Sequence, residues 1–144
     1  MPEGSRTPSA SRELVDLIWR WVDAWNRGDV DGVMAVFAPD AVWDAVGVGY
    51  EHLRGHTPIR AFIEAWLSPY DEFNLEPEEV VDLGNGVAFL ALDSTGRLVG
   101  SNGTVQLRFG FAGIYDADHI LSVTGYTDLD EARTAAERLA KERG

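Results

Sequence analysis

The residue best suited to chemistry is an aspartate in a short apolar segment, residues 41–46 (AVWDAV). If this segment is a β-strand, alternation places Asp44 on one face together with Val42 and Val46. A carboxylate held against an apolar wall loses hydration and becomes a better proton acceptor. Such a base can remove a proton from a carbon next to a carbonyl. We therefore predict Asp44 as a general base; the alternative is a surface aspartate satisfied by a nearby backbone N–H.

Two residues beyond this segment could donate or shuttle protons beside the aspartate, namely Tyr50 and His56. His52 and His56 stand four residues apart, which is the spacing of a metal-binding pair on a helix. Gly55 lies between them and argues against a helix there, and no third ligand is close in sequence. We predict a polar loop at the mouth of a pocket, and no metal site.

Composition excludes several classes of function. Acidic residues outnumber basic ones by 24 to 12, and the formal net charge is −12. Such a surface disfavours nucleic acid and anionic membranes as partners, because both require clustered basic residues. The chain has no cysteine, which rules out disulfides and thiolate chemistry and fits a cytoplasmic location. No apolar run is long enough to span a membrane. Phosphate-binding and dinucleotide-binding glycine motifs are absent, so we expect no cofactor.

Helical spacing dominates the first half of the chain. A first helix is predicted to begin after Ser11, which is its N-cap, and to end at residues 26–28 (NRG). Asp29 can cap a short second helix, and Thr57 followed by Pro58 predicts the start of a third. Apolar residues recur at helical spacing in the first helix and in the third. These residues are Leu14, Leu17, Ile18, Trp21, Val22 and Trp25, and then Ile59, Phe62, Ile63, Trp66 and Leu67.

The second half of the chain changes to a period of two. Four strands are predicted, at residues 79–83, 87–93, 104–111 and 120–126. Asn85-Gly86 is a hairpin signal between the first two of these strands, and Asp128 can cap a last helix. Helices that precede an antiparallel meander are typical of an α+β fold. We predict one domain over residues 11–142, preceded by a flexible N-terminal arm over residues 1–10.

Three segments resemble the nuclear transport factor 2-like superfamily, in its SnoaL-like and ketosteroid isomerase-like branch. They are VDAWNRGDVDGVMAVFAPDAVWD (residues 22–44), RGHTPIRAFIEAW (residues 54–66) and VTGYTDLDEA (residues 123–132). The resemblance implies a cystatin-like cone, in which three helices cover the concave face of a curved, mostly antiparallel sheet and a further helix follows at the C-terminus. It also implies a blind apolar pocket between these layers and a homodimer formed through the outer face of the sheet.

The resemblance assigns pocket positions to the first helix, the first strand, the third helix and the long strands. The substrate-binding residues it implies are Trp21, Trp25, Val42, Phe62, Trp66, Phe109 and Phe111. For the tryptophans and Phe62 the alternative is an ordinary hydrophobic core.

The resemblance also shows where this chain departs from known enzymes. Asp44 matches the catalytic base of ketosteroid isomerases, but the positions of their oxyanion-hole tyrosine and acid fall on Trp21 and Phe111. Trp21 offers one indole N–H and Phe111 offers no donor. The arginine and the last aspartate of the related epoxide hydrolases would fall near Leu92 and Gly125, so that catalytic set is missing.

We therefore predict a protein with a pocket for a small apolar molecule. One hypothesis is a cofactor-independent isomerase, cyclase or dehydratase that acts on a carbonyl compound, polyketide- or steroid-like in kind. The alternatives are a non-catalytic protein that binds an apolar ligand, and a dimeric interaction module.

Overall fold

The computed structural model describes residues 12–44 and 52–144, which form four helices and six strands. In chain order these elements are α1 (Arg12–Asn26), α2 (Val30–Val36), β1 (Phe37–Asp44), β2 (His52–Arg54), α3 (His56–Leu67), β3 (Tyr70–Gly84), β4 (Val87–Leu98), β5 (Thr104–Tyr115), β6 (Ile120–Tyr126) and α4 (Leu129–Arg143).

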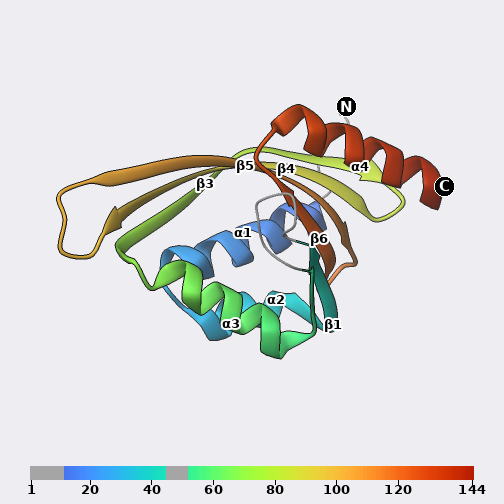
Figure 1. Cartoon of the computed structure of the whole chain (residues 1–144). Helices are drawn as coiled ribbons and strands as arrows, with labels where there is room; N and C mark the ends of the chain where they lie inside the picture. Colours follow the sequence, from blue (N-terminus) through green and yellow to red (C-terminus); the bar gives the residue numbers. More distant parts are fainter. Residues whose placement is uncertain (1–11, 45–51) are drawn as a thin grey trace.

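The strands form one curved sheet in the order β2-β1-β6-β5-β4-β3. All neighbouring strands are antiparallel except β1 and β6, which are parallel. Helices α1, α2 and α3 lie on the concave side of the sheet, and α4 lies on the opposite face (Figure 1). The predicted α+β architecture is confirmed.

The main core lies between the concave face and α1–α3. The apolar stripe predicted on α1 is buried there, with exposed fractions between 0% and 4%. Burying each large apolar side chain stabilises the fold by about 1.5–3 kcal/mol. This stripe therefore holds α1 against the sheet and fixes which of its side chains face the interior.

A second, smaller core joins α4 to the outer face of the sheet. Helix α4 contributes Ala132, Ala136 and Ala140, which pack with Phe89 among others. The contact is close because both sides carry small residues: a Cβ added at Gly110 would lie 2.5 Å from the Cβ of Ala132. The C-terminal helix thus covers part of the surface through which a homodimer was predicted.

Several predicted boundaries need correction. Strand β1 begins at Phe37, directly after α2 and four residues before the segment 41–46 that was predicted as a strand. Helix α3 begins one residue before Thr57, with Gly55 at its N-cap in a positive-φ conformation (φ 85°). The segment before α3, predicted as a polar loop, contains strand β2, which pairs with β1. The N-cap predicted at Ser11 lies outside the described residues.

The central strands are longer than predicted. Strand β3 starts at Tyr70 rather than at residue 79, and it passes Pro77 through a register shift. Strands β4 and β5 extend beyond the helices as a hairpin arm (Figure 1). At the opposite end, the β3–β4 turn has positive φ at Asn85 (58°) and Gly86 (74°), which confirms the predicted Asn-Gly turn.

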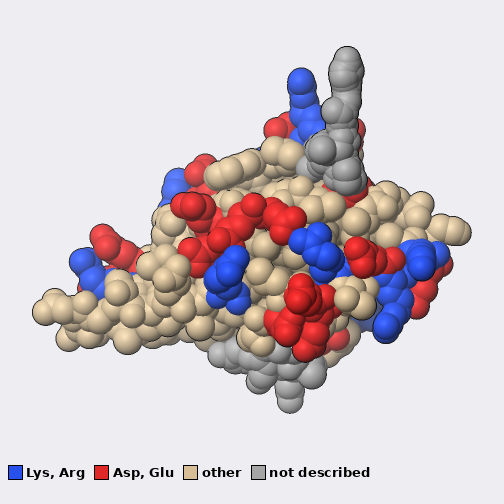
Figure 2. Space-filling view, turned by 90° about the horizontal axis from the view of Figure 1, so that it is seen from above, with Lys and Arg blue, Asp and Glu red and all other residues tan. Residues whose placement is uncertain are grey.

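The face that carries α4 has basic and acidic side chains interspersed, and the projecting arm is mostly uncharged (Figure 2). Ion pairs on this face join Arg108 to Glu78 and Arg133 to Glu79. Homodimerisation through the part of this face that α4 leaves uncovered stays a prediction. Among the helices of the described ranges, none combines the length and apolar character needed to cross a membrane.

Candidate functional site

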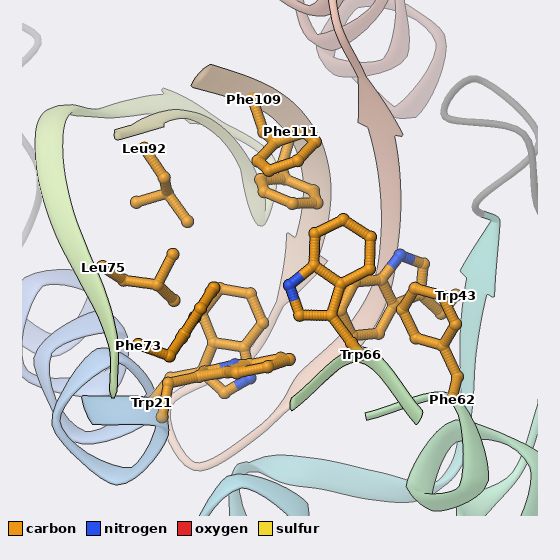
Figure 3. A pocket seen from close by; sticks show the side chains of 10 residues that line it. Trp21, Trp43, Phe62, Trp66, Phe73, Leu75, Leu92, Phe109 and Phe111 are labelled. Atoms are coloured by element: carbon orange, nitrogen blue, oxygen red, sulfur yellow. The ribbon is translucent and has the colours of Figure 1, made fainter. Parts of the chain in front are cut away.

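An apolar cavity of about 40 Å³ lies between the concave face of the sheet and the helices (Figure 3). Ten side chains line it, namely Trp21, Trp25, Trp43, Phe62, Trp66, Phe73, Leu75, Leu92, Phe109 and Phe111. None of them is titratable. Since one water needs about 10–15 Å³, the space is small, and rings fill most of the room between the layers.

The wall is built from rings that pack edge to face. Trp21, one helical turn from Trp25 on α1, makes T-shaped contacts with Trp25 and with Phe111 of β5, both at centroid distances of 6.1 Å. Trp43 of β1 contacts Phe62 of α3 at 5.0 Å. Pairs of this kind contribute about 0.5–1.5 kcal/mol each beyond the area they bury. The inner rings are therefore closely packed, and Phe62 is half-buried.

The cavity wall contains three polar atoms without partners. The indole Nε1 atoms of Trp21, Trp25 and Trp43 are buried, and none has a hydrogen-bond acceptor among the described residues. An unsatisfied buried donor costs about 1–3 kcal/mol. Three such donors around one cavity are unusual, because nearly all buried polar groups in native proteins are paired.

Six of the seven residues predicted to bind substrate line this cavity, and that they bind a substrate stays a prediction. The exception is Val42, which alternates with Trp43 along β1 and therefore faces the other side of the sheet. Four lining residues were not predicted: Trp43, Phe73, Leu75 and Leu92.

The placement of Asp44 contradicts the predicted strand orientation. Trp43 is 4% exposed and lines the cavity, so the next residue points to the outer face, where its pairing partner on β6 is Thr124. The Asp44 side chain is 37% exposed, and its Oδ2 lies 3.9 Å from Nδ1 of His52. As a general base for a ligand in the cavity, Asp44 has the wrong orientation.

The two residues predicted to act with Asp44 also lie apart from the cavity or outside the described residues. The Nε2 of His56, at the start of α3, lies 3.0 Å from the carbonyl oxygen of Phe37. A carbonyl only accepts, so this nitrogen is the donor and the bond holds the ring in place. Tyr50 lies in residues 45–51, outside the described ranges. Within those ranges, no group of three possible metal ligands lies together.

The positions that the resemblance assigned to an oxyanion hole do meet in space. Trp21 and Phe111 contact each other across the cavity. The pair supplies one indole donor and an apolar ring, so the two-donor arrangement needed to stabilise an enolate is not formed by these residues. Leu92 also lines the cavity, and none of the ten described lining residues is an arginine.

The comparison with known families identifies the domain. The sequence profile of the SnoaL-like domain matches residues 18–118, which is more than half of the chain. This chain belongs to the SnoaL-like domain family. The predicted membership of the nuclear transport factor 2-like superfamily is thereby confirmed. No curated protein matches the chain by sequence.

Solved structures of the same fold have low sequence identity to this SnoaL-like protein. A Mycobacterium tuberculosis protein in complex with estradiol-17beta-hemisuccinate is 18% identical with a TM-score of 0.69, over 83% of this chain and 97% of its own. A Catenulispora acidiphila protein in complex with trimethylamine is 12% identical with a TM-score of 0.69, over 84% and 92%. An epoxide hydrolase from M. tuberculosis is 16% identical with a TM-score of 0.65, over 88% and 90%. These likenesses establish the fold alone.

Proposed function

We propose that this SnoaL-like protein binds a compact apolar ring compound that carries a hydrogen-bond acceptor. The observation that carries the proposal is the cavity wall: ten aromatic or aliphatic side chains line it, and three of them carry a buried indole N–H without an acceptor among the described residues. Aromatic walls suit the flat faces of ring compounds. A ligand oxygen that reached one of the donors would remove the cost of leaving that donor unpaired.

Binding without turnover is favoured over acid–base catalysis. A general base must come within about 2.6–3.2 Å of the proton it removes. Asp44 faces the outer side of the sheet, and neither Asp44 nor His56 is among the side chains that line the cavity. An isomerase, cyclase or dehydratase activity would therefore need a base other than these two. The structures with bound estradiol hemisuccinate and trimethylamine support small-molecule binding as a use of this fold.

The size of the cavity limits the ligand. Its volume of about 40 Å³ is well below the range of about 300–1,000 Å³ that is usual for drug-sized ligands. The lining residues Phe62, Trp66 and Phe73 are only half-buried, whereas Trp21, Trp25 and Trp43 are at most 4% exposed. We expect these half-buried rings to move when a single-ring ligand enters, while the inner tryptophans stay in place.

The indole N–H resonances of the five tryptophans provide a direct test by NMR. Ethylbenzene and acetophenone have similar shapes and differ in the carbonyl oxygen. Titrating each into the ¹⁵N-labelled protein should shift the indole signals of cavity tryptophans. One added hydrogen bond is worth about 0.5–1.5 kcal/mol, so acetophenone should bind about two- to twelvefold more tightly than ethylbenzene. Its titration should also move at least one indole proton of Trp21, Trp25 or Trp43 downfield.

Trp19 is the internal control, because it lies on α1 but is 52% exposed and does not line the cavity. Its indole signal should not move with either compound. Equal affinity for the two compounds would refute the role of the acceptor. If neither compound shifts a cavity tryptophan, the binding function itself is wrong.

A further inference from the structure

The cavity adjoins a second, polar space. A groove of about 800 Å³ runs between the C-terminal ends of α1 and α3 and the neighbouring parts of β3, β4 and β5. These helix ends lie below the part of the sheet from which the arm extends (Figure 1). Trp25 and Phe73 line both the cavity and the groove, and their rings contact each other at 5.7 Å. The two spaces are therefore separated by one pair of aromatic rings.

The two rings of this pair differ in burial. Trp25 is 4% exposed, whereas Phe73 is half-buried and is backed by Tyr70 at a centroid distance of 5.4 Å. Tyr70 itself lies against Gly96 of β4, where an added Cβ would come within 2.4 Å of its ring. The absence of a side chain at Gly96 thus gives the two rings on β3 their position at the boundary.

The groove has the size and chemistry of a site for the polar part of a ligand. Its volume lies within the usual range for small-molecule sites. Its two arginines are already paired: Arg97 with Glu72 at 3.4 Å, and Arg27 with Asp23 at 2.6 Å. Asp71 lines the groove and makes no ion pair with the described residues. The charge left available in the groove is therefore negative.

From this continuity we infer that the ligand is elongated, with an apolar ring in the cavity and a cationic, amine-bearing end in the groove near Asp71. The inference rests on the proposed function, because it assigns the ring end to the same cavity. The inference goes further in two respects: it names the groove as a second binding region, and it specifies that the group bound there is positively charged.

Three probes of equal length test this inference: 4-phenylbutylamine, 4-phenylbutan-1-ol and 4-phenylbutanoic acid. They share the phenyl ring and the number of chain carbons: the amine and the alcohol carry the end group on four methylenes, and the acid carries its carboxylate on three. At neutral pH the end groups are cationic, neutral and anionic, respectively. An exposed ion pair is worth about 0.2–1 kcal/mol, so the amine should bind up to about fivefold more tightly than the alcohol. The acid should bind more weakly than either. The amine should also shift backbone amide signals at residues 71–74 and 95–97, which ethylbenzene leaves unmoved.

Matched variants separate a local effect from the general attraction of an acidic protein. Asp71→Asn should abolish the difference in affinity between the amine and the alcohol. Asp118→Asn makes the same change of charge in the exposed β5–β6 turn, outside the groove lining. This variant should still bind the amine more tightly than the alcohol. The advantage in the parent protein should fall as salt is added.

The outcomes distinguish the two proposals. If ethylbenzene binds in the cavity but the three longer probes bind equally well, or the acid binds best, the assignment of the groove is overturned and the cavity proposal stands. The same holds if Asp118→Asn removes the amine advantage as fully as Asp71→Asn does. If no probe, including ethylbenzene, shifts a cavity tryptophan, both proposals fail.

Discussion

Truncating Trp21 should reveal how much of the fold depends on the aromatic wall. Its ring is 1% exposed and contacts four others, those of Trp25, Phe37, Trp43 and Phe111, at 6.1–6.2 Å. Replacing a buried tryptophan by alanine costs about 3–5 kcal/mol. The loss of stability is partly offset because the variant no longer buries an unpaired indole N–H, which costs about 1–3 kcal/mol. We expect Trp21→Ala to lower the free energy of unfolding by about 3 kcal/mol, near the bottom of the truncation range.

Urea unfolding followed by far-ultraviolet circular dichroism measures this change without relying on tryptophan fluorescence. For a domain of this size, a loss of about 3 kcal/mol corresponds to a melting temperature lower by about 10 °C. Trp19→Ala on the same helix is the control and should change stability by at most about 0.5 kcal/mol, because that side chain is 52% exposed.

Trp21→Phe keeps a ring and removes the donor, so it should cost much less than the alanine variant, about 1 kcal/mol or below. It also provides a folded variant if Trp21→Ala does not fold. The reasoning fails if Trp21→Ala and Trp19→Ala cost the same. It also fails if the phenylalanine variant is as unstable as the alanine variant, since the indole N–H would then carry no penalty.

Three further predictions concern other parts of the molecule. Gly110→Ala should destabilise the protein by about 1–3 kcal/mol in thermal unfolding, because the new Cβ would lie 2.5 Å from that of Ala132. The amide of Gly32 donates to Asp29 and lowers the pKa of that carboxyl below its ordinary value of 3.8. The stabilisation by the ionised carboxylate is complete above pH 3.8 and is lost as the pH falls through the lowered pKa of the folded state. In urea unfolding, the difference in free energy of unfolding between the parent and Asp29→Asn should therefore become smaller at acidic pH. Asp44→Asn should leave the affinity for acetophenone unchanged within about twofold in the NMR titration.

The first two of these predictions have matched controls. Adding Ala132→Gly to Gly110→Ala should recover part of the loss, because it restores the space between α4 and β5. Asp16→Asn, at an exposed position of α1, should not reproduce the pH dependence seen with Asp29→Asn. A strong loss of acetophenone binding in Asp44→Asn would show that the carboxylate reaches the ligand and would contradict its placement on the outer face.

Elements with a strong local signal could be predicted from the sequence. Four of them are present in the structure, because each depends on spacing or on one local hydrogen bond: the α1 stripe, the cap at Asp29, the Asn85-Gly86 turn and the N-cap at Asp128. The start of β3 was missed because residues 70–78 are rich in acidic groups and include Pro77, which reads as a loop. These residues form a strand because pairing with β4 supplies partners that the local sequence does not reveal.

The predicted site depended on which face of the strand around Asp44 is buried, and the local sequence does not determine this. In the segment AVWDAV, alternation fixes that Trp43 and Asp44 face opposite sides but does not say which side is the interior. Ring size favours burying the tryptophan, and this signal was available in the residues. Phe73 and Leu75 were missed together with the start of β3, so the boundary between cavity and groove could not be foreseen.

Aromatic rings occupy the inward positions of the site, and this determines which chemistry the wall can support. Three inward positions that could have carried donors or a base hold Trp21, Trp43 and Phe111, which contact one another at 6.1–6.2 Å. Rings at these positions exclude water and stabilise the fold, but they cannot exchange a proton with a carbon acid at neutral pH. The polar groups that remain near the cavity are donors with fixed protons, and the charged groups lie in the groove beyond Phe73. Such a division suits recognition of a ring at one end and a charge at the other, and it leaves proton transfer without a participant in the described wall.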